Sequence, residues 1–242
     1  MSGHSKWATI KRKKAAVDAQ RGKIFTRLLR EIQVAAKLGG ANVDSNVRLK
    51  TAVQSAKSQS VPGDSIERAI KRGAGDADGA NYEDVVYEGY GPAGVAVLVK
   101  TLTDNKNRTV ADVRHAFSKY GGNMANANSV AYLFKDKGII TIGKEAIEED
   151  KLFDTALEAG ADDIKDEGDC WEVYTSPSAF EDVKVALEKL CPDLEAELAP
   201  VPDTKVTVTG EEAERVLKLL DALDDLDDVQ SVSSNADMPD EE

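Results

Sequence analysis

The hydrophobic residues in the first part of the chain recur with the period of an α-helix. Ile24, Leu28 and Ile32 fall on one face between residues 23 and 38, and most of the polar residues fall on the other faces. The pair Gly39-Gly40 follows, and glycine lets the backbone leave a helix. The pattern therefore predicts an amphipathic helix over residues 23–38.

Two shorter helices are predicted next. Asp44 is placed to cap a helix over residues 44–60, whose buried positions include Val47. Asp64 begins a capping-box sequence for a helix over residues 65–72. The Gly- and Asp-rich segment that follows has nothing to bury and is typical of a linker. The first domain is thus predicted to be three helices preceded by an arm.

After the linker the period of the hydrophobic positions changes from that of a helix to that of a strand. Residues 82–89 and 95–101 predict two strands joined by a Gly-rich hairpin turn. A helix over residues 107–120, capped by Asn107, and a strand over residues 129–134 are predicted to follow.

The middle of the chain has the order strand–helix–strand–strand–helix–strand. The six predicted elements span residues 137–142, 148–159, 161–166, 170–175, 178–190 and 195–199. This order is typical of a ferredoxin-like α+β unit, in which two helices back one sheet. A last strand, helix and strand are predicted over residues 205–209, 211–223 and 229–233.

The predicted fold class is a multidomain α+β protein. The elements between the linker and residue 135 are too few for a two-layer domain, and those after Pro202 would complete one. We therefore expect the ferredoxin-like unit to be inserted into a domain made of both flanks. The predicted domains are residues 1–79 (arm, helices and linker), residues 80–134 together with 202–242, and the inserted residues 135–201.

Charge is distributed unevenly along the chain. Residues 1–72 hold 16 Lys and Arg against 5 Asp and Glu, a net charge of +11, whereas residues 73–242 hold 15 against 39, a net charge of −24. A basic end on an acidic protein is typical of contact with nucleic acid or a membrane. Because no apolar run in the sequence is long enough to span a bilayer, we expect contact with nucleic acid and not with a membrane. Cys170 and Cys191 have neither CxxC spacing nor a disulfide framework and are typical of reduced thiols, so we expect a cytoplasmic protein.

The candidate contacts with nucleic acid are the basic residues of this end and one aromatic residue. Lys and Arg release counterions when they neutralise phosphates, and Trp7 offers a flat face on which an unpaired base can stack. The plainer alternative is a basic surface that contacts only solvent, with Trp7 packed on the domain. The candidates are Lys6, Trp7, Lys11, Arg12, Lys13, Lys14, Arg21, Lys23, Arg27, Arg30, Arg68, Lys71, Arg72 and, near the start of the helix over residues 107–120, Arg108.

No arrangement of residues supports an enzyme. The glycines of residues 89–94 match the dinucleotide-binding fingerprint, but a strand follows them instead of a helix, so we interpret them as a hairpin turn and expect no cofactor. His4 and His115 have no neighbours at metal-ligand spacing. The aspartates of residues 221–228 lack the glycine and closing glutamate of a calcium loop, so we interpret them as a solvated acidic face.

Several motifs, from Gly3-His-Ser-Lys-Trp7 near the start to Ser129-Val-Ala-Tyr-Leu-Phe134, resemble in sequence and order those of the YebC/PmpR family, along essentially the whole chain. The sequence departs from the family in two loops, with Ala93 where glycine is common and an Asn-rich segment at residues 123–128 where glycine and leucine are more frequent. The matching segments are Gly3-His-Ser-Lys-Trp7, Lys13-Lys-Ala-Ala16, Arg21-Gly-Lys-Ile-Phe-Thr26, Ile66-Glu-Arg-Ala-Ile-Lys-Arg-Gly73, Tyr87-Glu-Gly-Tyr-Gly-Pro92, Thr103-Asp-Asn-Lys-Asn-Arg-Thr109 and Ser129-Val-Ala-Tyr-Leu-Phe134.

The resemblance implies a three-domain cytoplasmic protein, with a helical first domain and a third domain inserted in the second. It also implies a probable transcriptional regulator that binds DNA, here through the basic N-terminal domain. Other members of the family imply an alternative, because a mitochondrial relative is a translational activator and bacterial members are tied to ribosomes that stall on proline-rich stretches. The alternative is a ribosome-associated translation factor that binds ribosomal RNA. Its polar loops at residues 103–109 and 123–128 would then reach a functional centre.

Overall fold

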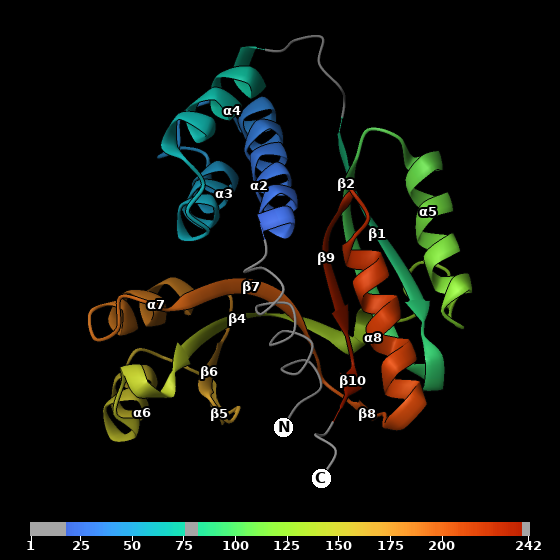
Figure 1. The fold of residues 1–242 in the computed structure, drawn as a ribbon. Helices are drawn as coiled ribbons and strands as arrows, with labels where there is room; N and C mark the ends of the chain where they lie inside the picture. Colours follow the sequence, from blue (N-terminus) through green and yellow to red (C-terminus); the bar gives the residue numbers. More distant parts are fainter. Residues whose placement is uncertain (1–17, 76–81, 239–242) are drawn as a thin grey trace.

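The computed structural model describes residues 18–75 and 82–238 of the chain, with side chains from residue 22 onward. A helical domain is followed by two α+β domains, as predicted (Figure 1). The helical bundle lies beside the sheet of the second domain, and the third domain extends from that sheet on long strands (Figure 1). The candidate site lies where ion pairs join the helical bundle to the second domain.

The first domain consists of α2 (Asp18–Gly39), α3 (Val47–Ser58) and α4 (Gly63–Gly75). Its core includes Ile32 and Ala36 of α2, Leu49 and Ala56 of α3, and Ile66 of α4, all of them buried. The predicted apolar face of α2 is therefore confirmed. The helix begins at Asp18, earlier than predicted, and ends next to Gly40, whose φ of 85° lies in the left-handed region that favours glycine.

Two predicted helix caps are wrong. Asn46, not Asp44, caps α3, because its side chain accepts a hydrogen bond from the Leu49 N–H and donates to the Ala35 carbonyl at the end of α2. A carboxylate could not donate that second bond. Val47 is 78% exposed rather than buried, because it is the first residue of the helix. Asp64 lies inside α4, which begins one residue earlier.

The predicted start of the linker is also wrong. Gly73 is buried within α4, and a Cβ atom there would overlap the carbonyl oxygen of Gln33 on α2. The residue thus permits close packing of two helices instead of forming a hinge. The rest of the predicted linker, from residue 76 on, lies outside the described residues.

The second domain is built on one four-stranded sheet with the order β3-β1-β2-β9. Its helices, α5 and α8, contribute buried residues to the core on one face of this sheet. A small parallel pair, β8 with β10, lies beyond the end of β9 (Figure 1). The elements are β1 (Glu83–Tyr90), β2 (Ala96–Thr103), α5 (Lys106–Lys119), β3 (Asn123–Met124), β8 (Val206–Thr207), α8 (Gly210–Asp224), β9 (Val229–Ser234) and β10 (Ala236–Asp237).

Strands from both sides of the third domain belong to this sheet. β9 pairs with β2 in antiparallel register, with Val232 opposite Val99. The third domain is therefore inserted into the second, as predicted. The exact division into residues 1–79, 80–134 with 202–242, and 135–201 stays a prediction, which the β2–β9 pairing supports.

The glycines of residues 89–94 lie in the predicted hairpin between β1 and β2. A short 3₁₀ helix, η1 (Pro92–Gly94), forms the turn. Ala93 has a φ of 55°, in the left-handed region. Ala93, where the resembled family commonly has glycine, thus lies where the backbone favours glycine, at a cost of about 1 kcal/mol.

The third domain has the predicted ferredoxin-like topology, with two helices on one antiparallel sheet of order β5-β6-β4-β7. Its apolar core is formed by residues such as Ile140, Leu152, Val173 and Leu187, all fully buried. The elements are β4 (Phe134–Gly143), α6 (Glu149–Glu158), β5 (Asp163–Asp166), β6 (Cys170–Thr175), α7 (Phe180–Glu188) and β7 (Glu195–Pro202).

The segment before β4 is not the predicted strand but a loop with a 3₁₀ turn, η2 (Ala131–Leu133). The buried carboxylate of Glu88 accepts hydrogen bonds from the N–H groups of Asn128, Val130 and Ala131, at 2.6, 2.7 and 2.8 Å. Burial alone would raise the pKa of Glu88, but these bonds lower it overall. A side chain thus takes the place of a neighbouring strand as hydrogen-bond partner.

Candidate nucleic-acid interface

Three of the candidate cations lie on one side of α2 and face the acidic end of α8. Lys23, Arg27 and Arg30 are spaced by four and three residues, which places them on neighbouring turns of the same face. Opposite them lie Asp224, at the end of α8, and the turn that follows it. We call this contact the interdomain seam: Lys23, Arg27 and Arg30 against Asp224, Asp225, Asp227 and Asp228.

The outer part of the seam consists of two ion pairs. Lys23 Nζ lies 3.0 Å from Asp225 Oδ1, and both side chains are about half exposed. Arg27 Nη1 lies 3.2 Å from Asp224 Oδ1, and its Nη2 donates to the Asp224 carbonyl. Both side chains of this second pair are largely buried. The pairing thus becomes less exposed to solvent toward the inside of the seam.

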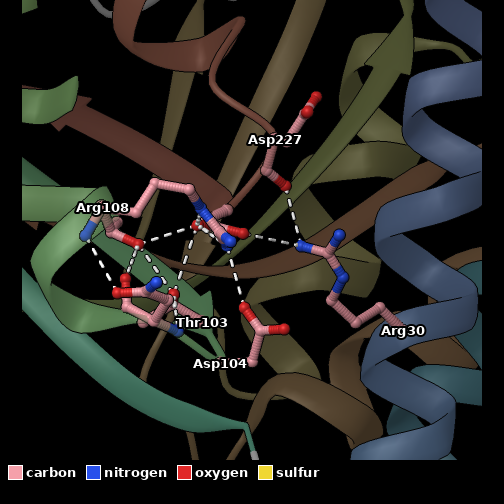
Figure 2. A network of polar contacts seen from close by, with 8 residues as sticks. Arg30, Thr103, Asp104, Arg108 and Asp227 are labelled. Carbon is pink, nitrogen blue, oxygen red and sulfur yellow. Dashed lines mark hydrogen bonds and ion pairs between the residues drawn. The ribbon is translucent and has the colours of Figure 1, made fainter. Parts of the chain in front are cut away.

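The inner part of the seam joins Arg30 to the last two aspartates. Arg30 Nη1 donates to the Asp227 carbonyl at 2.9 Å and to Asp228 Oδ1 at 3.3 Å (Figure 2). The same guanidinium lies over the ring of Tyr82, 5.4 Å from its centre. Arg30 therefore uses one terminal nitrogen as a hydrogen-bond donor and its flat face for the aromatic contact.

Asp228 is the centre of a polar network that reaches into the second domain. Its side chain is only 8% exposed. Its Oδ2 accepts from Arg108 Nη2 and Thr109 Oγ1, each at 2.7 Å, and from Thr103 Oγ1 at 3.2 Å. Arg108 also donates to Asp104 at 2.9 Å (Figure 2). The predicted cap of α5 is corrected here as well, because Asn105 rather than Asn107 accepts from the Arg108 N–H.

The network stabilises the charged states of Asp228 and Arg108. Burial alone would raise the pKa of Asp228, but the hydrogen bonds and charge of Arg108, with the hydroxyls of Thr109 and Thr103, lower it overall. The same bonds to Asp228 and Asp104 raise the pKa of Arg108. Asp228 is therefore an anion, and Arg108 a cation, at neutral pH.

The interpretation of residues 221–228 as a solvated acidic face is wrong for its inner members. Asp224 and Asp228 are mostly buried against arginines of the first domain. Arg27 and Asp224 are 197 residues apart in the sequence, so no local pattern could predict the pairing. Of the predicted nucleic-acid contacts, Lys23, Arg27, Arg30 and Arg108 are therefore bound to aspartates of the same chain.

A second link between the domains was missed by sequence reasoning. Arg48 of α3 lies 2.6 Å from Glu31 of α2 and 2.8 Å from Asp84 of β1. Hydrogen bonds to these two carboxylates raise the pKa of Arg48. The fork geometry of a guanidinium suits two carboxylates, but the sequence carries no signal that these three residues meet.

The other candidate cations of the described helices have different surroundings. Arg68, Lys71 and Arg72 are exposed and spaced by three and one residues, so they share one side of α4. Arg68 donates to the Asp64 carbonyl and to Ser65 Oγ of its own helix. Among the described residues, none of the three forms an ion pair. We call these three side chains the α4 basic face.

The remaining candidates fall outside the described side chains. Arg21 belongs to the first turn of α2, and the other six precede that helix. Those six are Lys6, Trp7, Lys11, Arg12, Lys13 and Lys14. Their contact with nucleic acid stays a prediction.

Residues 18–75 and 82–238 contain no group of three or more His, Cys, Asp or Glu side chains that could hold a metal ion. Within the same residues, no helix combines the length and the apolarity that a membrane crossing requires.

Comparisons with known proteins agree with the fold. Residues 5–76 match the family model of the TACO1/YebC protein N-terminal domain, and residues 82–236 match that of the TACO1/YebC second and third domain. The crystal structure of a conserved hypothetical protein from Aquifex aeolicus has a TM-score of 0.84 to this chain at 46% identity, covering 94% of each chain.

Relatives with similar sequences share one name. A "probable transcriptional regulatory protein" of Desulforapulum autotrophicum is 57% identical over 242 residues, covering 100% of this chain and 98% of the relative. A protein of the same name from Geobacter sulfurreducens is 54% identical over 243 residues, with the same coverage. The resemblance found in the sequence is therefore confirmed, and the chain belongs to the TACO1/YebC family.

Proposed function

We propose that this chain is a cytoplasmic transcriptional regulatory protein that binds DNA through its basic N-terminal domain. The observation that carries the proposal is the charge asymmetry, with a net charge of +11 over residues 1–72 and −24 over the rest. Neutralised phosphates release counterions, which favours binding of the basic end, while the acidic domains are repelled by DNA. The names of the relatives support the same function.

The α4 basic face and the basic residues before α2 are the contacts that the proposal requires. Arg68, Lys71 and Arg72 are exposed and free of ion pairs with described residues, so a phosphate does not have to displace a carboxylate to reach them. The first turn of α4 carries Asp64, which disfavours insertion of that end into a groove. Contact with the sugar–phosphate backbone is therefore favoured over reading of bases.

The test measures affinity for duplex DNA by fluorescence anisotropy over a range of salt concentrations. Changing Lys11, Arg12, Lys13 and Lys14 together to Ala should weaken binding and lower the salt slope by about 0.9 for each phosphate that the variant no longer neutralises. The control removes four positive charges from the acidic part of the chain, and an equal slope in both variants would contradict the proposal. The control changes to Ala are at Lys151, Lys184, Lys189 and Lys205.

Ribosomal RNA is the second candidate target, in which case the protein is a translation factor. The observation that favours it is that Asp64 lies in the first turn of α4, the helix of the basic face, which disfavours reading of the major groove by that helix. Co-sedimentation with ribosomes, with and without ribonuclease, tests the ribosomal target. Binding to promoter DNA, compared with binding to scrambled DNA, tests the DNA target. If the protein pellets with ribosomes, loses this association on ribonuclease treatment and shows no preference among DNA sequences, the translation-factor function is supported and the regulator function is contradicted. In both cases the protein acts by binding, without catalysis, cofactor or small-molecule substrate.

A further inference from the structure

The interdomain seam holds cations of the same kind as the α4 basic face, but aspartates of the chain itself occupy them. We infer that the outer seam is a second polyanion site, in which Asp224 and Asp225 stand where phosphates of a nucleic acid bind. The inference rests on the proposed function and adds a site and its regulation. Nucleic acid and the acidic turn after α8 would compete for the same face of α2.

The chemistry of the seam matches that of a phosphate contact. Lys23 and Arg27 each donate to a carboxylate oxygen, and Arg27 places both of its terminal nitrogens on Asp224. Lys and Arg bind phosphate oxygens through the same charge-assisted hydrogen bonds, and the guanidinium can donate to either a carboxylate or a phosphate. Two neighbouring anions along the acidic turn therefore resemble two phosphates along a strand.

The gradient of exposure decides where displacement is possible. In the Lys23–Asp225 pair the side chains are 47% and 63% exposed, so solvent screens the attraction and the pair stabilises the seam little. In the Arg30–Asp228 pair they are 18% and 8% exposed. Asp228 is also held by Arg108, Thr103 and Thr109. The Arg27–Asp224 side chains, 12% and 21% exposed, are about as buried as the Arg30–Asp228 pair. A polyanion therefore replaces Asp225 first and Asp224 only after it, while Asp228 keeps the domains connected.

The position of the outer seam in the chain favours this competition. Lys23 lies in the first turns of α2, nine residues after Lys14, the last cation of the predicted arm contacts. A strand held by those residues is thereby kept close to Lys23, which raises its effective concentration at the seam. Two carboxylates of a short turn then compete with many phosphates of one bound strand for the same cations.

The test neutralises the competing aspartates in the full-length protein. Asp224→Asn with Asp225→Asn should raise the affinity for duplex DNA about two- to tenfold, the range expected when one half-exposed and one largely buried ion pair are removed. The salt slope should become steeper by up to about 2, because Lys23 and Arg27 each lose a competing carboxylate and can neutralise a phosphate instead. The matched control, Asp112→Asn with Asp154→Asn, removes the same charge from exposed positions on α5 and α6.

A double-mutant cycle identifies the cation that binds the added phosphate. Arg27→Gln should reduce the affinity little in the wild-type protein, where Asp224 occupies the guanidinium. The same change should abolish much of the increase in affinity in the Asp224→Asn, Asp225→Asn background, because the released guanidinium is then missing.

The outcomes separate this inference from the proposed function. Equal affinities and slopes for the seam variant, the control and the wild-type protein would overturn the inference, while measurable binding by all three would leave the proposed function standing. An increase in affinity that Arg27→Gln does not reduce would also overturn it, because general charge would then explain the effect. Loss of DNA binding in every variant and in the wild-type protein would overturn both, unless ribosomal RNA gives the predicted increase in the same assay.

Discussion

The helical domain carries two groups of cations that differ in their surroundings, not in their residue types. On α2, Arg27 and Arg30 are mostly buried and bound to aspartates from the other end of the chain. On α4, Arg68, Lys71 and Arg72 are exposed, and none forms an ion pair with a described residue. The comparison teaches that a net charge counted along the sequence overstates the charge that a partner can reach, because part of it is neutralised within the fold.

The largest effect is expected at the centre of the seam. Asp228→Ala leaves Arg108 and two threonine hydroxyls without their common acceptor, and should lower the free energy of unfolding by about 3 kcal/mol. Urea unfolding followed by circular dichroism measures it. Asp227→Ala is the control, since that exposed residue contributes its backbone carbonyl to Arg30, and its effect should stay below about 0.5 kcal/mol. Equal losses of unfolding free energy in Asp228→Ala and Asp227→Ala would show that the buried Asp228 carboxylate does not stabilise the seam.

The next effect separates the two groups of cations by phenotype. Changing Arg68, Lys71 and Arg72 together to Gln should weaken binding of duplex DNA roughly tenfold and lower the salt slope by up to about 3, without loss of stability. Changing Arg27 and Arg30 to Gln should do the reverse, with a lower melting temperature and nearly unchanged affinity. Anisotropy and thermal unfolding on the same samples measure both. If the two variants behave alike, the distinction between the groups fails.

Acid should open the seam and leave the α4 basic face unchanged. The pKa of Asp228 is lowered in the folded protein, so its contribution to stability is fully present above the ordinary pKa of an aspartate, about 4. It is lost as the pH falls through the lowered folded value. The difference in unfolding free energy between the wild-type protein and Asp228→Asn should therefore shrink as the pH is reduced from 7 to 3. A difference that stays constant would show that the carboxylate charge does not stabilise the seam.

The smallest effect is expected at the outer edge of the seam. Lys23→Gln removes an ion pair between two half-exposed side chains and should cost less than about 0.5 kcal/mol. The effect should largely disappear in about 1 M salt, because the Debye length falls to about 3 Å and exposed charges are then strongly screened. Unfolding at low and high salt measures it. A cost as large as that of Arg27→Gln would remove the gradient on which the competition with nucleic acid depends.

The local periodicities of the sequence determined the elements and much of their arrangement. The apolar face of α2, the hairpin of β1 and β2, and the ferredoxin-like order of the third domain all follow from patterns within one or two neighbouring segments, because periodic burial of side chains is a local property. The identification of the family rested on short motifs, which are local as well.

Tertiary structure decided what these patterns could not. Asn46 replaces Asp44 as a cap because its amide also reaches the end of α2, and Gly73 is a packing contact because α2 passes directly over it. The predicted phosphate contacts Arg27 and Arg30 are bound to Asp224 and Asp228 because the fold brings the two ends of the chain together. The sequence determined which side chains carry charge. Which of those charges remain available to a partner depends on distances and burial that exist only once the domains have packed.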